Sequence, residues 1–494
     1  MSRSIEPRCE RRGFNEKEGV ATIVATVSCV RTIFATQPNE ATRRWWSHVR
    51  VLASDSMQGR DTGSAGYRKA ADYVTAQFAR AGLQPAGESG FSQSVPLHAV
   101  RFRADQSTLS LVRANGRTTS LRWLRQMTVP PRTGMPSTID APLAFAGWQI
   151  NDAFDVRGKV LVTLAPPRFI PNRRGYVQAP PPGYLGSIVI ESPAGPEPAR
   201  WPAFSSLAMT LSSVPLPAQA AGGAIFLQFN PADADELFRG SGHAYRELQA
   251  LADAGEHLPS FALPASLRGR MVFDTIALRS DNLIAVRRGA DPVLADEYVV
   301  VSAHLDGYGV GEAVNRDRIY NGTLDDAAYV ATLIELADRL GTMGQGLRRS
   351  VLFCVFTAEE RGLLGSQYFA AHPTVPKERM VANINLDMLR PVFPLTSLTT
   401  MALDESTLGD HVRRVGESMR LRIKPDSEPD RGLLQRSDHW SFLQAGVPAV
   451  GFTFGYEPGS IEEAAYRRWY AERSHSPADD VNQPWDPAAA ERFK

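Results

Sequence analysis

The sequence predicts an α/β fold, in which a mixed, mostly parallel sheet carries helices on both faces and is interrupted by an inserted β-rich domain. Three observations lead to this prediction. Four apolar runs have the length and composition of buried strands: 298–303, 351–356, 381–386 and 447–452. Between the first two runs, apolar residues recur at helical spacing: Val330, Leu333, Ile334 and Ala337. Such alternation is typical of a sheet covered by helices on both faces, and a proline-rich region upstream of it has a different character.

The amino terminus has the residue order of a secretory leader. Arg11 and Arg12 precede an apolar stretch at 19–30, and small residues follow around Ala35. A basic, then apolar, then cleavable order is typical of export signals. Arg31 interrupts the apolar stretch, which leaves a disordered cytoplasmic tail as the alternative. We therefore expect 1–40 to be a leader or a disordered N-terminus, and the protein to be secreted or periplasmic.

The rest of the chain is expected to form a main domain in two segments and an insert between them. Residues 41–104 read as the N-terminal part of the main domain, because apolar residues recur at helical spacing up to Gly82, a position suited to a left-handed C-cap. Between 105 and 278 prolines cluster and separate short β-rich runs, such as 159–163 and 224–228. Prolines prevent long helices, so this segment is expected to be the β-rich insert. Residues 279–494 form the main part of the domain.

Composition restricts the class of protein. At 494 residues the chain is too long for one ordinary core, and 43% hydrophobic with 22% charged residues is the balance of a globular protein. The net charge of +1 argues against a nucleic-acid partner, which would need a concentrated basic face. Beyond the leader no apolar run approaches the ~20 residues of a membrane span, so no stable span is expected.

The cysteines do not suggest a disulfide framework or a thiolate metal site. The chain has three, Cys9, Cys29 and Cys354. Cys354 lies within the apolar run 351–356, where a buried, inert thiol is expected. None of the three has a cysteine or histidine neighbour at zinc-finger spacing. Any zinc bound by this chain would therefore have carboxylate and imidazole ligands.

Polar residues stand where the predicted strands end. His304 and Asp306 follow the first strand, Glu359 and Glu360 follow the second, and Asp387 ends the third. Taken singly, each has an ordinary explanation as a loop hydrogen bond or a helix cap. In open α/β sheets, however, ligands bind outside the carboxyl ends of the strands, so these side chains should share one edge.

So many like charges at one edge would repel each other unless a cation lay among them. Imidazole and carboxylate ligands suit Zn²⁺, and two ions ~3.5–4 Å apart can share a bridging carboxylate. The residues alone therefore predict a divalent metal centre at the carboxyl edge of the sheet.

The order of the motifs resembles the co-catalytic dizinc aminopeptidase family, whose members have a zinc-peptidase-like fold. The family includes leucyl-type aminopeptidases and glutamate carboxypeptidase, with glutaminyl cyclases and transferrin receptors as relatives. The motifs that carry the resemblance are His304-x-Asp306, Asn321-Gly-x-x-Asp325-Asp326, Glu359-Glu360, Asp387 and His475-Ser-Pro-x-Asp479. Segments 52–60, 281–286 and 436–449 resemble the family as well, and segments 155–160 and 221–225 resemble the protease-associated insert of its secreted members.

The resemblance implies two zinc ions and their ligands. One ion would be bound by His304 and Asp387, the other by Glu360 and His475, and Asp325 would bridge the two. A hydroxide bridging the metals would attack the scissile carbonyl of a peptide substrate.

It also implies roles around the ions. Glu359 would be the general base, and Asp306 would hold the correct tautomer of His304. The peptide bond between Asp325 and Asp326 would be cis. This chain departs from the family in carrying Tyr329 where many relatives have glycine, and His439 is expected to lie beside the site rather than on a metal.

The predicted activity is hydrolysis of N-terminal peptide bonds. A free α-amine is a small cation, which a carboxylate-rich site favours, whereas a C-terminal carboxylate would need an arginine clamp. Arg390, Arg431 and Arg436 are candidates for such a clamp, so a carboxypeptidase or dipeptidase remains an alternative. A catalytically silent binding ectodomain is a third hypothesis, and the oligomeric state is left open.

Overall fold

The computed structural model describes residues 38–131, 135–147, 154–164, 183–191, 207–213, 223–343 and 346–493. The predicted leader, apart from its last residues, lies outside these ranges, as do Cys9 and Cys29. No helix in the described part of the chain combines the length and apolarity that crossing a bilayer requires.

The described strands of the main domain form a ten-stranded mixed sheet in the order β19-β18-β20-β17-β13-β16-β12-β2-β9, with β1 beside β12. The four strands expected from the apolar runs form its centre and are parallel to one another: β13 (Tyr298–His304), β16 (Ser350–Phe356), β17 (Met380–Asn385) and β20 (Ala449–Phe454). The strands that flank them are β1 (Gln84–Pro85), β2 (Ser92–Phe102), β9 (Leu207–Leu211), β12 (Phe273–Arg287), β18 (Ser397–Met401) and β19 (Arg422–Pro425). β12 and β18 pair antiparallel with the outer strands of this parallel centre, and β19 pairs parallel with β18 at one edge of the sheet.

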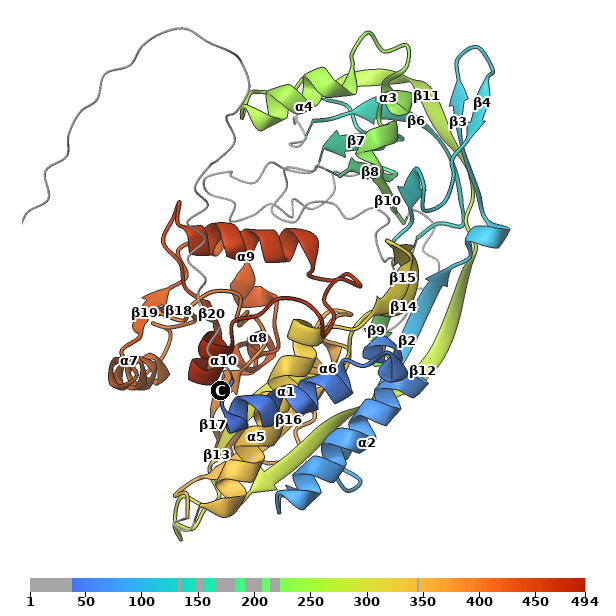
Figure 1. Ribbon diagram of the computed structural model, residues 1–494. Helices are drawn as coiled ribbons and strands as arrows, with labels where there is room; N and C mark the ends of the chain where they lie inside the picture. The colour runs from blue at the N-terminus through green and yellow to red at the C-terminus, as the bar shows by residue number, and fades with distance from the viewer. Residues whose placement is uncertain are drawn as a thin grey trace, which may run out of the picture. The chain divides into compact units, whose positions relative to one another are not determined.

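Helices cover both faces of this sheet, which explains why its central strands are mostly apolar. α1 (Glu40–Leu52), α2 (Ala65–Arg80) and α5 (Ala328–Thr342) lie side by side on one face (Figure 1). Within β16, Phe353 and Val355 pack with this layer. The alternate residues, among them Cys354, belong to the cluster on the other face, with α6 (Leu364–Ala371) and α8 (His439–Gln444). Cys354 is buried, as predicted.

Three more helices and a hairpin belong to the described part of the main domain. These elements are α7 (Leu408–Ser418), α9 (Ile461–Glu472), α10 (Pro487–Phe493), β14 (Gly309–Val314) and β15 (Asp317–Tyr320). α7 packs on β19 and β20, and α10 packs on α1. α2 ends before Gly82, whose φ of +77° is the left-handed conformation expected of a C-cap. α1 packs on α5, where the Trp45 indole N–H donates to the backbone oxygen of Ala328 over 2.9 Å.

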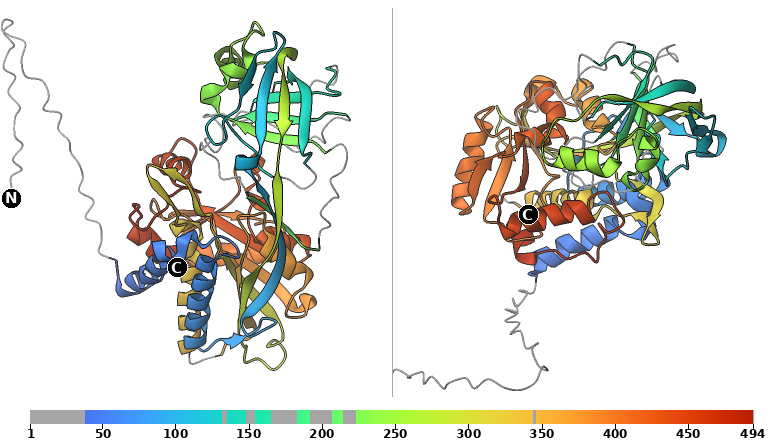
Figure 2. Two further views of the ribbon diagram at one scale, coloured as in Figure 1. Left: turned by 90° about the vertical axis from the view of Figure 1, so that its right-hand side faces the viewer. Right: turned by 90° about the horizontal axis from the view of Figure 1, so that it is seen from above.

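Residues 108–270 contribute a second, eight-stranded sheet in the order β4-β3-β11-β6-β7-β8-β10-β5. Its strands are β3 (Thr108–Arg113), β4 (Thr118–Ser120), β5 (Met127–Thr128), β6 (Thr138–Phe145), β7 (Val160–Leu164), β8 (Gly186–Ile190), β10 (Ile225–Phe229) and β11 (Phe261–Arg270), and two short helices accompany them, α3 (Asp235–Phe238) and α4 (Tyr245–Asp253). This sheet has its own hydrophobic cluster. The long strands β2 and β12, paired antiparallel from Ser92 to Phe102, run from the ten-stranded sheet towards it (Figure 2). The predicted boundary at 278 falls inside β12, and the division into domains stays a prediction.

Candidate metal centre

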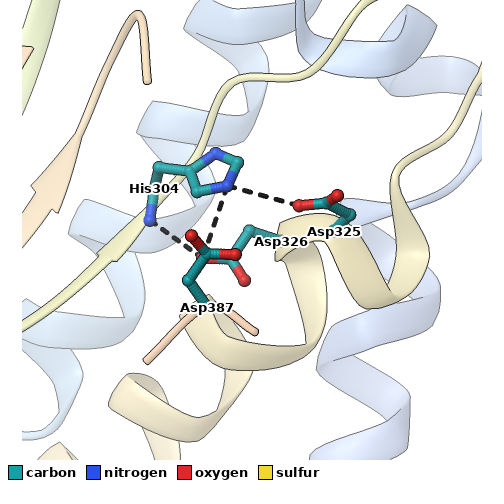
Figure 3. Close-up of side chains that lie close together, drawn as sticks. All are labelled: His304, Asp325, Asp326 and Asp387. Carbon is teal, nitrogen blue, oxygen red and sulfur yellow. Dashed lines mark hydrogen bonds and ion pairs between the residues drawn. The ribbon is translucent and has the colours of Figure 1, made fainter. Parts of the chain in front are cut away.

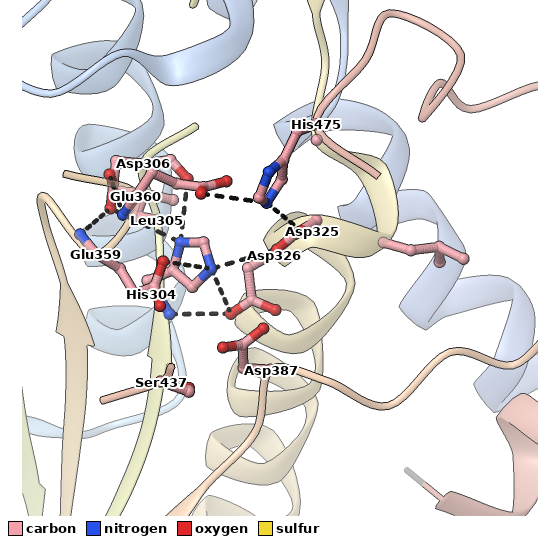
Figure 4. A network of polar contacts seen from close by, with 12 residues as sticks. His304, Leu305, Asp306, Asp325, Asp326, Glu359, Glu360, Asp387, Ser437 and His475 are labelled. Carbon is pink, nitrogen blue, oxygen red and sulfur yellow. Dashed lines mark hydrogen bonds and ion pairs between the residues drawn. The ribbon is translucent and has the colours of Figure 1, made fainter. Parts of the chain in front are cut away.

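The predicted site residues come together at the carboxyl edge of the central strands (Figure 4). His304 is the last residue of β13, Glu359 and Glu360 lie in the turn after β16, and Asp387 follows β17. Asp325 comes from the segment leading into α5, and His475 from the loop after α9. Parallel strands end at one edge, which is why residues far apart in the sequence meet here.

A first cluster of possible ligands is fully buried. The ligand atoms of His304, Asp325, Asp326 and Asp387 lie within 4.8 Å of one another (Figure 3). His304 Nε2 lies 3.5 Å from Asp325 Oδ1 and 4.0 Å from Asp326 Oδ2. These side chains surround a point on the buried side of the Asp325 carboxylate.

A second cluster lies on the other side of Asp325. His475 Nε2 is 3.5 Å from Asp325 Oδ2 and 3.4 Å from Glu360 Oε2. The two clusters share Asp325, whose two carboxylate oxygens each face a different histidine. Its peptide bond to Asp326 is cis, as the family resemblance implied. As far as the described residues go, neither cluster includes a side chain from 105–278.

Asp306 contacts the His304 imidazole through its backbone oxygen rather than through its carboxylate. His304 Nδ1 lies 3.1 Å from the backbone oxygen of Asp306, whereas the Asp306 carboxylate is 3.7 Å away. That carboxylate instead accepts the backbone N–H groups of Glu359 at 3.0 Å and Glu360 at 3.3 Å. Asp306 therefore holds the imidazole with its main chain and the glutamate turn with its side chain.

Two aspartates complete the scaffold of the site. Asp326 Oδ2 accepts the backbone N–H of His304 over 2.9 Å, a role that sequence reasoning did not assign. In the sequence, only the position of Asp326 next to Asp325 indicated that it belongs to the site. Asp479, which closes the last sequence motif, accepts the backbone N–H groups of Leu324 at 3.0 Å and Asp325 at 3.1 Å. The segment that presents Asp325 is thus tied to the loop that presents His475.

The motif at 52–60 acts through Arg60, which is fully buried. Its guanidinium donates to the backbone oxygens of Leu305 at 2.8 Å, Asn321 at 2.6 Å and Gly322 at 2.8 Å. Gly59, with φ of +64°, precedes it, and a Cβ there would meet the Gly309 oxygen at 2.5 Å. Arg60 therefore connects, by hydrogen bonds, the segment after His304 with the segment before Asp325.

Burial and crowding shift the acid–base equilibria of the site. Burial raises the pKa of Glu359 well above its usual range and the pKa of Glu360 to about 7. Burial also opposes ionisation of Asp325, but Arg390 and the two histidines outweigh it and hold the pKa of Asp325 well below its usual value. For His304, burial disfavours the cation, yet the surrounding carboxylates raise its pKa well above normal. The site is therefore short of positive charge.

The donor set and its spacing fit zinc. Donors each ~2.0–2.2 Å from one tetrahedral ion lie roughly 3.3–3.6 Å apart, and the closest His–carboxylate pairs here are 3.4–3.5 Å apart. Those separations are too long for hydrogen bonds. Within the described structure His304 Nε2 has no hydrogen-bond partner although it is buried among carboxylates. Divalent cations would satisfy both the orphaned nitrogen and the excess negative charge.

Arg390 is neither a surface nor a free pocket residue. Its side chain is 2% exposed, and Nη2 lies 3.3 Å from Asp325 Oδ2 and 3.7 Å from Asp387 Oδ1. Nη1 donates to the backbone oxygen of Asp387. The guanidinium lies 4.8 Å from the Trp469 ring centre and 5.7 Å from that of Tyr329. Tyr329, the departure from the family pattern, is fully buried and thus helps to enclose this arginine.

The other residues considered from the sequence lie apart from the ligands. His439 is buried against Gly451, and burial lowers its pKa to about 4. Arg431 pairs with Glu428 at 3.4 Å and stacks on a tyrosine ring. Arg436 is exposed on the wall of the site.

The site opens into a cavity of about 250 Å³. Its lining combines the carboxylates with a few apolar and polar groups: Asp325, Glu359, Glu360, Gly362, Leu363, Asp387, Met388, Arg390, Leu433, Gln435, Arg436, Tyr470, Ser474 and His475.

Comparison with known proteins places the similarity in the region that carries the site. Residues 282–494 match the model of Peptidase family M28. The chain is 27% identical over 205 residues to aminopeptidase YwaD of Bacillus subtilis (strain 168), covering 41% of this chain and 40% of that protein. It is 27% identical over 214 residues to a probable glutamate carboxypeptidase LAMP1 of Arabidopsis thaliana, covering 41% and 30%. The matched segments thus span less than half the length of these curated relatives.

Solved structures share the fold over most of the chain. An aminopeptidase from Aneurinibacillus sp. strain AM-1 superposes with a TM-score of 0.57 at 19% identity, covering 91% of this chain and 90% of that one. BSAP, a zinc aminopeptidase from Bacillus subtilis, gives a TM-score of 0.53 at 17% identity, covering 92% and 93%. These likenesses establish the fold, including the predicted α/β class.

Proposed function

Because residues 282–494 of this chain are a Peptidase family M28 domain, we propose that the protein is a zinc-dependent aminopeptidase with two ions per chain. The observation that carries the proposal is the position of Asp325, with one oxygen 3.5 Å from His304 Nε2 and the other 3.5 Å from His475 Nε2. A carboxylate between two histidines is the arrangement that a bridging ligand needs.

The ligands are assigned as follows. His304 and Asp387 hold one ion, Glu360 and His475 hold the other, and Asp325 bridges them. When bound, the ions polarise the scissile carbonyl and lower the pKa of the attacking water. His304 Nδ1 donates to the Asp306 backbone oxygen, which leaves Nε2 as the ligand atom.

Glu359 moves the proton. It lines the cavity, its Oε2 lies 3.7 Å from His304 Nε2, and the Asp306 carboxylate fixes its main chain. Glu359 takes a proton from the attacking water and delivers it to the leaving amine, which makes it the general base and then the general acid.

The charges around the cavity favour the amino end of a peptide. Several of the carboxylates that line it attract a free α-amine. Of the three arginines considered as a carboxylate clamp, Arg390 is committed to Asp325 and Asp387, and Arg431 is paired with Glu428. Only Arg436 of these three lines the wall from an exposed position. It is the residue that a dipeptidase or carboxypeptidase would use, and that activity is the second candidate.

Comparison of one peptide in three forms tests the proposal. The free peptide and its C-amidated form should be hydrolysed, and the N-acetylated form should not. Cleavage that survives N-acetylation and fails after C-amidation would assign a carboxypeptidase instead. No cleavage of any form by the zinc-loaded protein would favour a silent binding ectodomain.

We also propose export and a protease-associated role for the insert. The leader-like order at 1–40 supports secretion or localisation in the periplasm. The second sheet, which adds no ligand among the described residues, would wall the cleft and limit access to short or flexible substrates. Fractionation of the producing cell, with N-terminal sequencing of the mature protein, tests the first point. Retention of the uncleaved chain in the cytoplasm would contradict it.

A further inference from the structure

Tyr308 links two side chains of the second cluster. Its hydroxyl oxygen lies 3.2 Å from His475 Nδ1, and the two rings are 4.7 Å apart between centres. The Glu360 carboxylate lies near the same hydroxyl and interacts with it. One phenol thus contacts both residues that the second metal position does not share with the first.

The donor and acceptor roles follow from the chemistry of a ligating histidine. His475 can offer Nε2 to a metal only as the tautomer that carries its proton on Nδ1, and that proton needs an acceptor. At His304 the backbone oxygen of Asp306 is the acceptor. At His475 the Tyr308 oxygen accepts the Nδ1 proton, while the phenol proton is donated to Glu360. The phenol satisfies both demands at once, which a phenylalanine could not.

The Tyr308 ring is held in place from behind. The Arg361 guanidinium lies 5.4 Å from the ring centre, and Arg361 itself pairs with Asp61 at 2.7 Å. The backbone of Asp61 also forms an isolated parallel β-bridge with Gly307, the residue before Tyr308. His475 needs such support, because its side chain is 29% exposed and its φ is +53°. The His304 ring, by contrast, is 1% exposed and enclosed by the core.

We propose that Tyr308 is a positioning residue for the second metal position, where it selects the tautomer of His475 and fixes Glu360 beside it. The proposal rests on the proposed dimetal function. It predicts that the two positions depend on different supports, a main-chain oxygen for the first and a phenol for the second.

Tyr308→Phe in the full-length protein tests this. Zinc binding is measured by competition with a chromophoric chelator, starting from the metal-free protein. We expect the second ion to bind 10–100-fold more weakly, as is usual when such a supporting hydrogen bond is lost, and the first ion to bind as in the wild type. In the Co²⁺-loaded protein, the visible absorption of the second ion should change while that of the first persists.

Tyr320→Phe is the matched control. It removes a phenol hydroxyl that donates to the Glu312 backbone oxygen over 2.9 Å in the neighbouring hairpin, and both affinities should stay unchanged. Second-ion affinity within twofold of wild type in Tyr308→Phe would overturn the proposal, as would equal weakening of both ions. A wild-type protein that binds only one ion would overturn the dimetal function itself, so the two failures are distinguishable.

Discussion

Replacing Arg390 with methionine should make the stability of the protein depend strongly on metal. Arg390 is the cation that faces Asp325 Oδ2 at 3.3 Å, and both side chains are more than nine-tenths buried. At an effective dielectric constant of about 20, their Coulomb attraction is roughly 5 kcal/mol before the cost of desolvation. Removing one partner of a buried ion pair typically costs about 3–5 kcal/mol. Methionine fills most of the space between the rings, so the lost charge should dominate.

Zinc should mask most of this loss. Without Arg390 the metal-free protein has an uncompensated carboxylate cluster, whereas bound divalent ions supply the missing positive charge. We expect Arg390→Met to lower the free energy of unfolding by about 3–5 kcal/mol in the metal-free form. In the zinc-loaded form the loss should be only about 1–2 kcal/mol, which is the contribution of the guanidinium's contact with the aromatic rings. Urea unfolding of both forms, at fixed pH and free zinc, measures the difference.

Arg431→Met provides the comparison. Arg431 also stacks on a tyrosine ring, at 5.4 Å, and pairs with a glutamate at 3.4 Å, but it is partly exposed and away from the ligands. Its loss should cost a similar small amount in both forms. The reasoning about Arg390 would be refuted by a loss below about 1 kcal/mol in the metal-free protein, or by equal losses with and without zinc.

Three further outcomes are expected. Glu359→Gln should keep its zinc and lose about 10²–10⁴-fold in kcat, measured with an aminoacyl anilide; loss of zinc instead would exchange the roles of Glu359 and Glu360. Dialysis against a chelator should abolish hydrolysis and lower Tm, and zinc should restore both; activity that persists after metal analysis shows no bound ion would contradict the proposed chemistry. Because burial lowers the pKa of His439 to about 4, its contribution is complete above the ordinary pKa near 6.5 and is lost as pH falls towards 4, by up to roughly 3 kcal/mol. Urea unfolding against pH checks this, and His439→Asn should lack that part of the slope.

The strands of the site were predictable because their pattern is local. A strand covered on both faces is mostly apolar, and apolar residues predominate in β13, β16, β17 and β20. The residues that end such strands share an edge, so His304, Glu359 and Asp387 could be brought together before any coordinates. Asp325 and His475 are different, since they come from loops whose positions no local pattern sets. Their assignment depended on the resemblance to a family.

Other features could not be anticipated, because they depend on side-chain direction. Arg390 follows a metal-site aspartate and reads equally well as a surface residue, and only the packing of Trp469 and Tyr329 turns it towards Asp325. Tyr308 carries no motif signal, since a tyrosine in a loop is ordinary.

By itself, then, the sequence determined the class of the main domain, the edge at which chemistry gathers and the kind of ligand present there. These follow from the periodicity of burial and from the residue types at strand ends, both of which are properties of short segments. Tertiary structure alone decided which atom of Asp306 holds His304, which cation compensates Asp325 and which hydroxyl supports His475. Each of these is a contact of a few ångströms between segments that the chain brings together only on folding, and hydrogen bonds and ion pairs change partners over such distances.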